Sequence, residues 1–447
     1  MDFISNRLPQ IKAMLSEMGI TNVEELFKSI PPTLILPSPL TDDGMSEYEG
    51  MQTMESLAAR NTFSILDNYL GGGAYDHHIP ALIPAICSKS EFLTSYTPYQ
   101  AEASQGMLQI IFEFQSAICA LTGMDAANAS VYDGASACAE ALLMALRFQK
   151  TRPKVLVADS LHPHYKGVIE QYLKNQPGKI EWIPFLQEGG AINHNAFEEK
   201  LDEDTAAVLI QSPNFFGILE DVKIVSRLAK EKGAVTILCA NPISYGLFMS
   251  AAEQGVDIAV GDCQPFGLTL GFGGPYAGYM GCQTELLRQL PGRIVGETAD
   301  TKGKRGFVLT LQAREQHIRR EKATSNICTN QALAALASLI SMLWYGKEGA
   351  KALALTNYQR AHYLKYHLSL AGVHVWDQYP TFNEFVADFS RPIDEVVNHF
   401  RKAGIEPGIE LRRYHPQFEK SLLIAVTETK NQAKLDRFIE VARELKK

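Results

Sequence analysis

The sequence predicts an α/β protein with a mostly parallel central sheet, and two observations support this class. Short apolar runs alternate along the middle of the chain with amphipathic helical stretches. Each run is apolar at nearly every position, as expected for strands buried on both faces of a parallel sheet. The chain has 447 residues, of which 46% are hydrophobic and 21% charged, a globular composition with room for more than one domain.

Residues 1–60 are expected to form an N-terminal arm rather than a domain. Their helical turns are interrupted by Pro31 and Pro32, and they hold too little apolar surface for a core of their own. We therefore expect this arm to wrap on another surface. Residues 71–78 (GGGAYDHH) follow soon after, and their three glycines permit backbone conformations closed to other residues.

A large α/β domain is expected over residues 61–345. Its strands are predicted at residues 154–159, 180–185, 206–211, 235–241, 257–262 and 277–282. Intervening segments such as residues 224–232 have helical periodicity.

The pattern changes in residues 346–447, where we expect a small α+β domain. A helix is predicted near residues 352–371, a strand at 382–389, a helix beginning at Pro392 and a strand at 421–428. A terminal helix follows, with five apolar residues on one face: Leu435, Phe438, Ile439, Ala442 and Leu445.

Composition excludes several classes of function. The net charge of −8 argues against a nucleic-acid-binding protein, which would show a basic stripe. The seven cysteines form no C-x-x-C pair, so neither a zinc ribbon nor a disulfide framework is expected. The first residues lack a signal-peptide core, and the apolar residues 332–344 are too few to span a bilayer. We expect a cytoplasmic protein without metal, membrane or nucleic-acid partners.

Functional groups of open α/β sheets gather beyond the carboxyl ends of the strands. Gly134, Ala135 and Ser136 open an alanine-rich helix there, whose free backbone N–H groups could hold a phosphate. Capping of the helix by Asp133 or Ser136 is the alternative interpretation. The glycine-rich residues 271–275 are no dinucleotide fingerprint, because Tyr276 stands where the last glycine is required.

Two groups of titratable residues are weaker candidates. His162 and His164 follow a strand end, although histidines with satisfied hydrogen bonds are the commoner case. Arg314, Arg319 and Arg320 could clamp a carboxylate, or could form a charged helix face paired with neighbouring glutamates.

Longer motifs connect the chain to a known family. These are residues 96–106 (YTPYQAEASQG), 112–115, 121–124, 128–133 (NASVYD), 271–275 (GFGGP) and 312–329 (QAREQHIRREKATSNICT). They resemble the N-terminal half of glycine decarboxylase, the P-protein of the glycine cleavage system, over nearly the whole chain. In this family one long chain of two homologous halves is divided, in some organisms, into two subunits. The chain resembles the first of them, which implies the aspartate-aminotransferase-like fold of pyridoxal-phosphate-dependent transferases (fold type I).

The resemblance also implies where the cofactor groups should lie. A Schiff-base lysine is required just beyond the strand that ends near Asp262, but Gln264, Pro265 and Phe266 stand there, and no lysine occurs between Lys232 and Lys302. The acid that pairs with the pyridine nitrogen is replaced by Asn241. Gly134, Ala135 and Ser136 then form a vestigial phosphate cup.

This departure implies a division of labour between two chains. Pyridoxal phosphate is expected on a lysine-bearing second subunit, in an α2β2 heterotetramer, with none bound covalently to this chain. The assembled oxidoreductase would decarboxylate glycine and pass its aminomethyl group to the lipoylated carrier H-protein, whereas the isolated chain would be inactive. Tyr96, Tyr99 and Arg314 are the candidates for reaching the shared active site.

Two alternatives remain open. One is a self-contained pyridoxal-phosphate decarboxylase or lyase that uses a lysine displaced in sequence. The other is a pseudoenzyme scaffold or regulator without a role in turnover.

Overall fold

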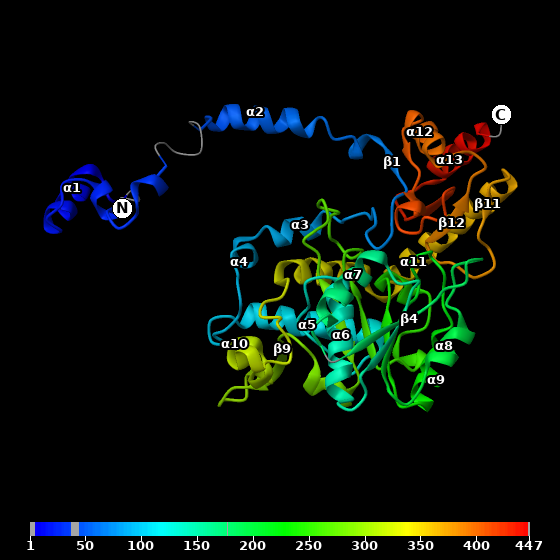
Figure 1. Ribbon diagram of the computed structural model, residues 1–447, viewed down its shortest axis with the longest axis horizontal. Coiled ribbons are helices and arrows are strands. Elements are labelled where there is room, and N and C mark those ends of the chain that lie inside the picture. The colour runs from blue at the N-terminus through cyan, green and yellow to red at the C-terminus, as the bar shows by residue number, and fades with distance from the viewer. Residues whose placement is uncertain (1–4, 37–43, 177, 446–447) are drawn as a thin grey trace. The chain divides into compact units, whose positions relative to one another are not determined.

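A computed structural model of the chain describes residues 5–36, 44–176 and 178–445. It contains two compact units, Met1–Ser64 and Ile65–Lys447, whose elements are labelled along the chain in Figure 1. The domain boundaries expected after residues 60 and 345 remain predictions.

The first unit is made of short helices. Its described elements are α1 (Leu8–Glu17), η1 (Val23–Phe27), η2 (Pro32–Leu34) and α2 (Glu47–Ala58), and η3 (Phe63–Ile65) runs across its end. Ser46 and Glu49 form a capping box at the start of α2. Among the described residues of this unit only Leu15 is buried, so these helices build no core. Residues 37–43 of the expected arm lie outside the described residues.

The second unit contains a central sheet that, in the described part of the chain, has seven strands in the order β2-β8-β7-β6-β5-β3-β4. The strands are β2 (Ala126–Ala127), β3 (Lys154–Ala158), β4 (Lys179–Ile183), β5 (Thr205–Gln211), β6 (Val235–Cys239), β7 (Ile258–Asp262) and β8 (Gly278–Cys282). The strands from β7 to β4 pair in parallel, whereas β8 is antiparallel to both β7 and β2. The mostly parallel sheet predicted from the apolar runs is confirmed.

Alternate residues of the central strands enter two separate cores, which is why each run is apolar throughout. Val157 and Ile237 face one core, and Leu156 and Leu238 face the other. The first core is covered by α6 (Gly134–Phe148) and α7 (Pro163–Leu173), and the second by α5 (Gln105–Thr122), α8 (His194–Lys200), α9 (Val222–Glu231) and the start of α11 (Ala332–Leu370).

A smaller antiparallel sheet, β11-β12-β15-β14, forms the C-terminal part. Its elements are β11 (His374–Val375), β12 (Glu384–Asp388), α12 (Ile393–Lys402), β14 (Ile409–Glu410), β15 (Ser421–Ala425) and α13 (Gln432–Glu444). The apolar face predicted for the last helix is buried in this core. Helix α12 begins one residue later than expected, with Pro392 at the N-cap. The long helix α11 leads into this part and is interrupted at Gly346, where φ is 56°.

The remaining described elements connect these sheets. They are β1 (Asp67–Asn68), α3 (Leu82–Cys87), α4 (Ser90–Leu93), η4 (Pro242–Gly246), η5 (Ala252–Gln254), η6 (Thr284–Gln289), β9 (Ile294–Ala299), β10 (Arg305–Thr310), η7 (Gln312–Arg314), α10 (Gln316–Arg319), η8 (Arg320–Lys322), β13 (Ile405–Glu406) and η9 (Leu411–Arg413). Strand β1 pairs in parallel with β13, so the segment that follows it starts against the C-terminal part. None of the described helices combines the length and apolar character needed to cross a bilayer.

Candidate functional site

The carboxyl ends of β6 and β7 bring together several of the residues singled out in the sequence. Asn241 lies two residues beyond β6, and Asp262 ends β7 with Gln264 two residues further on. The first turn of α6, which begins at Gly134, reaches the same edge, because Asp262 binds it directly. The fold therefore brings together the residues that the sequence predicted around a cofactor position.

The N-terminus of α6 is occupied by carboxylates of the chain itself. Asp262 Oδ2 accepts a hydrogen bond of 3.0 Å from the backbone nitrogen of Gly134. Asp133 caps the helix by accepting one of 2.7 Å from the nitrogen of Ser136. A Cβ atom on Gly134 would lie 2.4 Å from the Tyr165 hydroxyl oxygen, so the turn is also closely packed. Two carboxyl groups of the chain already accept from two of the backbone donors that a phosphate would require.

Both polar atoms of the Gln264 side chain also make hydrogen bonds within the chain. Its Oε1 accepts from the backbone nitrogen of Tyr75 at 2.8 Å, and its Nε2 donates to the carbonyl oxygens of Tyr75 at 2.9 Å and Leu268 at 3.1 Å. Pro265 and Phe266 are buried, the latter in an apolar cluster with Leu353 and Phe382. Gln264 thus fastens a distant segment where a lysine would otherwise project.

That segment, residues 71–78, is here called the strap, and it also binds the C-terminal part. The Glu384 carboxylate accepts bonds of 2.6 Å from both the Gly72 nitrogen and the Tyr75 hydroxyl. Lys430 Nζ lies 3.0 Å from Asp76 Oδ2. A Cβ atom on Gly71 would lie 2.2 Å from Glu384 Oε1, so this position requires glycine. The sequence pointed to the strap only through its glycines and gave no sign of Glu384.

His162, in the loop that follows β3, contacts the strap. Its Nε2 lies 2.5 Å from the Gly72 carbonyl oxygen, while its Nδ1 accepts from the His164 nitrogen at 3.1 Å. Burial lowers the pKa of His162 to about 4. The ring is therefore neutral and both of its nitrogens are used, which is the arrangement of a structural histidine.

Two buried carboxyl groups at this edge have raised pKa values. Burial raises the pKa of Glu384 to about 7, against the opposing effect of the bonds from Tyr75 and Gly72. Burial likewise raises the pKa of Asp262 to about 7, against the bonds from the Gly134 and Gln264 nitrogens. Both carboxyl groups accept hydrogen bonds from backbone nitrogens. A change in the protonation of Glu384 would therefore alter a contact of the strap, and a change in that of Asp262 would alter a contact of α6.

These residues do not fit covalently bound pyridoxal phosphate. Gln264 provides no amine, and the sequence holds no lysine between Lys232 and Lys302. Asn241 cannot supply a carboxylate to the pyridine nitrogen. The Gly134 and Ser136 nitrogens at the start of α6 already donate to Asp262 and Asp133.

The three interface candidates lie elsewhere. Tyr96 is 72% exposed and Tyr99 is 52% exposed. The Tyr99 hydroxyl is 3.3 Å from Nη2 of the buried Arg293, which the sequence did not single out. Arg314 is half-buried and lines a pocket that includes neither Tyr96 nor Tyr99. Within the described ranges, no recorded hydrogen bond, ion pair or ring contact joins these three residues to the strap, Asn241 or Gln264.

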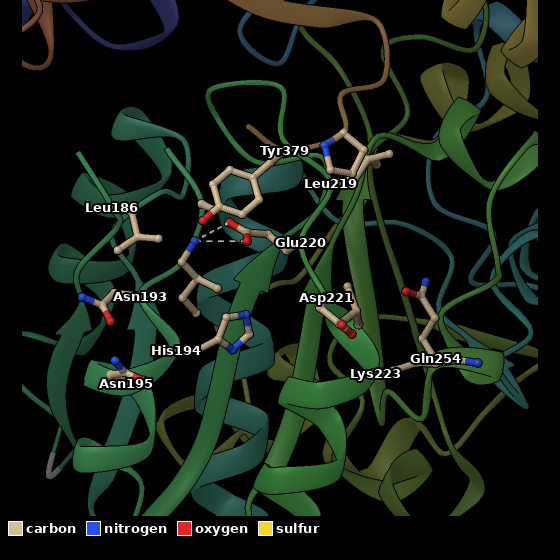
Figure 2. Close-up of a pocket in the computed structure, with 14 residues that line it drawn as sticks. Leu186, Asn193, His194, Asn195, Leu219, Glu220, Asp221, Lys223, Gln254 and Tyr379 are labelled. Carbon is tan, nitrogen blue, oxygen red and sulfur yellow. Dashed lines mark hydrogen bonds between the residues drawn. The ribbon is translucent and has the colours of Figure 1, made fainter. Parts of the chain in front are cut away.

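A pocket of about 650 Å³ opens beside α8 and α9 (Figure 2). His194, Asp221 and Tyr379 line it, but none of the site residues expected from the sequence does. Glu220 in its wall accepts bonds from the Ile192 nitrogen at 3.1 Å and from Asn214 Nδ2 at 2.7 Å. This carboxylate therefore has a structural role.

The order and direction of the strands define the class of fold. The chain has the fold of pyridoxal-phosphate-dependent enzymes of fold type I. A sphingosine-1-phosphate lyase from Burkholderia pseudomallei shares this fold at 14% identity, with 92% of this chain and 93% of that chain covered and a TM-score of 0.67. A glutamate decarboxylase from Lactobacillus brevis does so at 12% identity, with 94% and 97% covered and a TM-score of 0.67.

Within this class the chain belongs to the family described as the glycine cleavage system P-protein, whose sequence profile matches residues 1–442. Relatives named "Probable glycine dehydrogenase (decarboxylating) subunit 1" are 71% identical in Protochlamydia amoebophila and 46% identical in Desulfitobacterium hafniense, with 100% of both chains covered in each case. A crystal structure of glycine decarboxylase (P-protein) of the glycine cleavage system, in inhibitor-bound form, matches at 38% identity and a TM-score of 0.90, with 100% of both chains covered. The family and the fold implied by the sequence motifs are confirmed.

Proposed function

We propose that the chain acts as subunit 1 of a two-chain glycine dehydrogenase (decarboxylating) and completes an active site whose cofactor is carried by a second subunit. The observation that carries this proposal is the closed state of its own cofactor position. Gln264 holds Tyr75, and Asp262 occupies the start of α6. A member of a pyridoxal-phosphate-dependent family that cannot hold the cofactor needs another chain to do so.

The partner in this proposal is a homologous chain that bears the Schiff-base lysine, assembled with this one as an α2β2 heterotetramer. Glycine is the substrate, and the lipoylated H-protein receives the aminomethyl group that remains after decarboxylation. The chain contributes surface around the shared cleft, with Tyr96, Tyr99 and Arg314 as the residues proposed to reach it. The scattered cysteines support a reducing, cytoplasmic location.

Co-expression with the lysine-bearing subunit tests this function directly. Glycine-dependent exchange of carbon dioxide should require both chains and should be absent from each chain alone. Full exchange by the second subunit alone would overturn the proposal.

A scaffold or regulator without a role in turnover is the second candidate, because the chain lacks a Schiff-base lysine near Gln264. Deletion of the gene, with the lysine-bearing chain retained, separates the two. Loss of glycine decarboxylation supports the proposed subunit, and unchanged decarboxylation supports the scaffold.

A further inference from the structure

The segment of residues 269–275 between β7 and β8, here called the glycine loop, has one large side chain at its tip. Phe272 is 99% exposed, more than any other large apolar side chain of the described residues. It joins none of the apolar clusters found among those residues. Gly271, Gly273 and Gly274 surround it, and a Cβ atom added to Gly273 would meet no atom within 4 Å. The tip is therefore narrow and presents a single phenyl ring to its surroundings.

The backbone holds this ring outward in an unfavourable conformation. Phe272 has a φ of 58°, in the left-handed region that bulky residues rarely adopt. The turn is fixed at the carbonyl oxygen of Leu270, which accepts from the Gly273 nitrogen at 3.0 Å and from the Tyr276 hydroxyl at 2.7 Å. A hydrated apolar ring held in this way contributes nothing to the stability of the isolated chain. Its use is therefore expected in contact with another molecule.

The base of the glycine loop is fixed at the edge of the sheet where the cofactor position was predicted. Gln264 Nε2 donates to the carbonyl oxygen of Leu268 at 3.1 Å, and Leu268 packs against an apolar cluster built from α3 and α11. The preceding glycine is equally close to these helices, because a Cβ atom on Gly267 would lie 2.8 Å from Ile83 Cδ1 and 3.0 Å from the Ala337 carbonyl oxygen. The ring therefore projects from a rigid base.

Helix α11 has further apolar side chains on the face that packs against α3. Leu336 and Ile340 are buried with Ile83 of α3. Leu333 and Trp344 continue the same spacing of three to four residues, but both remain exposed. The helices that support the glycine loop thus leave apolar surface uncovered, which is typical of a protein–protein contact site.

We propose that Phe272 inserts its ring into a narrow apolar pocket of the lysine-bearing second subunit and anchors the assembly of the two chains. The inference rests on the proposed function and names the residue through which the partner is held. Buried aromatic anchors of this kind contribute much of the binding free energy of protein–protein interfaces.

The position of the glycine loop favours the second subunit as the occupant. The loop shares α3 with the segment that leads to Tyr96, because α3 contacts α4 and Tyr96 follows α4 by three residues. Tyr96 is a residue proposed to reach the shared cleft, so a chain that receives Phe272 lies on the same side of this subunit as that cleft. A second copy of this chain would bring no lysine to it.

Titration of the chain against the purified second subunit tests the proposal. Phe272→Asn removes the ring while keeping the loop conformation, since asparagine tolerates a positive φ, and it should raise the dissociation constant at least tenfold. Phe272→Leu keeps an apolar side chain and should lose less affinity. The matched control is Phe148→Asn, which removes another exposed ring at the opposite end of α6 from Gly134 and should leave the dissociation constant unchanged.

Two further measurements exclude an indirect effect. Urea denaturation of isolated Phe272→Asn should match wild type, because the exposed ring has no packing to lose. A photoreactive p-benzoylphenylalanine at position 272 should crosslink to the second subunit in the assembled enzyme, and the same group at position 148 should not. A crosslink to a second copy of this chain instead would overturn the proposal.

The proposal is also overturned if Phe272→Asn binds the second subunit as tightly as wild type, or if Phe148→Asn loses affinity equally. In both cases the proposed function stands as long as glycine-dependent exchange of carbon dioxide still requires the two chains. Failure of the proposed function gives a different result, because the wild-type chains would then form no complex or the second subunit would be fully active alone. Absence of a wild-type complex would overturn both proposals.

Discussion

Gln264 binds both backbone polar groups of Tyr75, although the two residues are 189 positions apart in the sequence. The bonds measure 2.8 and 2.9 Å, and both side chains are buried. A glutamine at the position expected for the catalytic lysine therefore fastens the strap across the cofactor position. Gln264 therefore has a structural role at the position where the lysine is missing.

Gln264→Ala should destabilise the chain. It leaves the buried N–H and carbonyl groups of Tyr75 without partners, which should lower the free energy of unfolding by about 2–4 kcal/mol. Urea denaturation followed by circular dichroism measures the change. Gln171→Ala, at an exposed position of α7, is the control and should stay within about 0.5 kcal/mol of wild type. Equal stability of the two variants would contradict the role given to Gln264.

The isolated chain should not bind pyridoxal phosphate covalently. Incubation with the cofactor and reduction with borohydride should leave every lysine without a stoichiometric pyridoxyl adduct in peptide mapping. The double variant Gln264→Lys/Asn241→Asp restores an amine and an acid, yet it should also give only substoichiometric labelling, because Glu384 still holds the Tyr75 hydroxyl and Asp262 still occupies the start of α6. One lysine labelled in full on the wild-type chain would refute this expectation.

The stability contribution of Glu384 should fall as the pH rises. Its pKa is raised to about 7 in the folded chain, above the ordinary value of a glutamate, so the native state binds the proton more tightly. The contribution is complete below about pH 4.5, is lost between about pH 4.5 and 7, and is constant above that range.

Glu384→Gln isolates this effect because the amide does not titrate. The stability of wild type relative to this variant should decrease by about 2–3 kcal/mol between pH 5 and pH 8 in urea denaturation. Glu198→Gln, an exposed position on α8, should show no such trend. A difference between wild type and Glu384→Gln that does not depend on pH would mean that the Glu384 pKa is not raised.

Tyr96→Phe should lower glycine decarboxylation by the assembled enzyme. The Tyr96 hydroxyl makes no recorded hydrogen bond within the described residues, so a contact in the shared cleft is the proposed use for it. Loss of that contact should reduce kcat/KM about ten- to a hundredfold, or about 1.4–2.7 kcal/mol. Tyr366→Phe, which changes another exposed tyrosine, should have no effect. Wild-type activity of Tyr96→Phe, with assembly unchanged in gel filtration, would reject a catalytic contribution from this residue.

Tyr99→Phe should behave differently because the Tyr99 hydroxyl contacts Arg293. Its removal should cost about 1 kcal/mol of stability in the isolated chain, in addition to any loss of activity in the complex. Denaturation of the isolated chain separates these two effects. Unchanged stability would show that the contact with Arg293 contributes little.

Removal of residues 1–60 should weaken assembly with the second subunit while the rest of the chain stays folded. The described residues of this segment bury only Leu15, and α2 exposes Met51, Met54 and Leu57. Co-purification of the truncated chain at full yield would show that the arm has another role. Met51→Ser/Met54→Ser tests the apolar face of α2 alone, with Gln52→Ser/Glu55→Ser as the matched control on the same helix.

Most of the fold could be predicted because the signals that specify it are local. Buried strands are apolar at successive positions, as in β6, where Ile237 and Leu238 face opposite cores. The terminal helix could also be predicted, since Leu435 and Phe438 follow helical spacing and are buried together. The start of α12 was displaced by one residue because proline is accepted both at the N-cap and at the first helical position.

The sequence by itself determined the class of fold, the family, and the absence of both an amine near Gln264 and an acid at Asn241. Only the tertiary structure decided what replaces them. Tyr75 and Glu384 are 309 positions apart, and Asp262 reaches Gly134 across 128 positions. No local pattern encodes such pairs, because their hydrogen bonds form only after the sheet has brought the strap, α6 and the C-terminal part to one edge. The contacts that fasten the strap beside the predicted cofactor position are therefore a property of packing between distant segments.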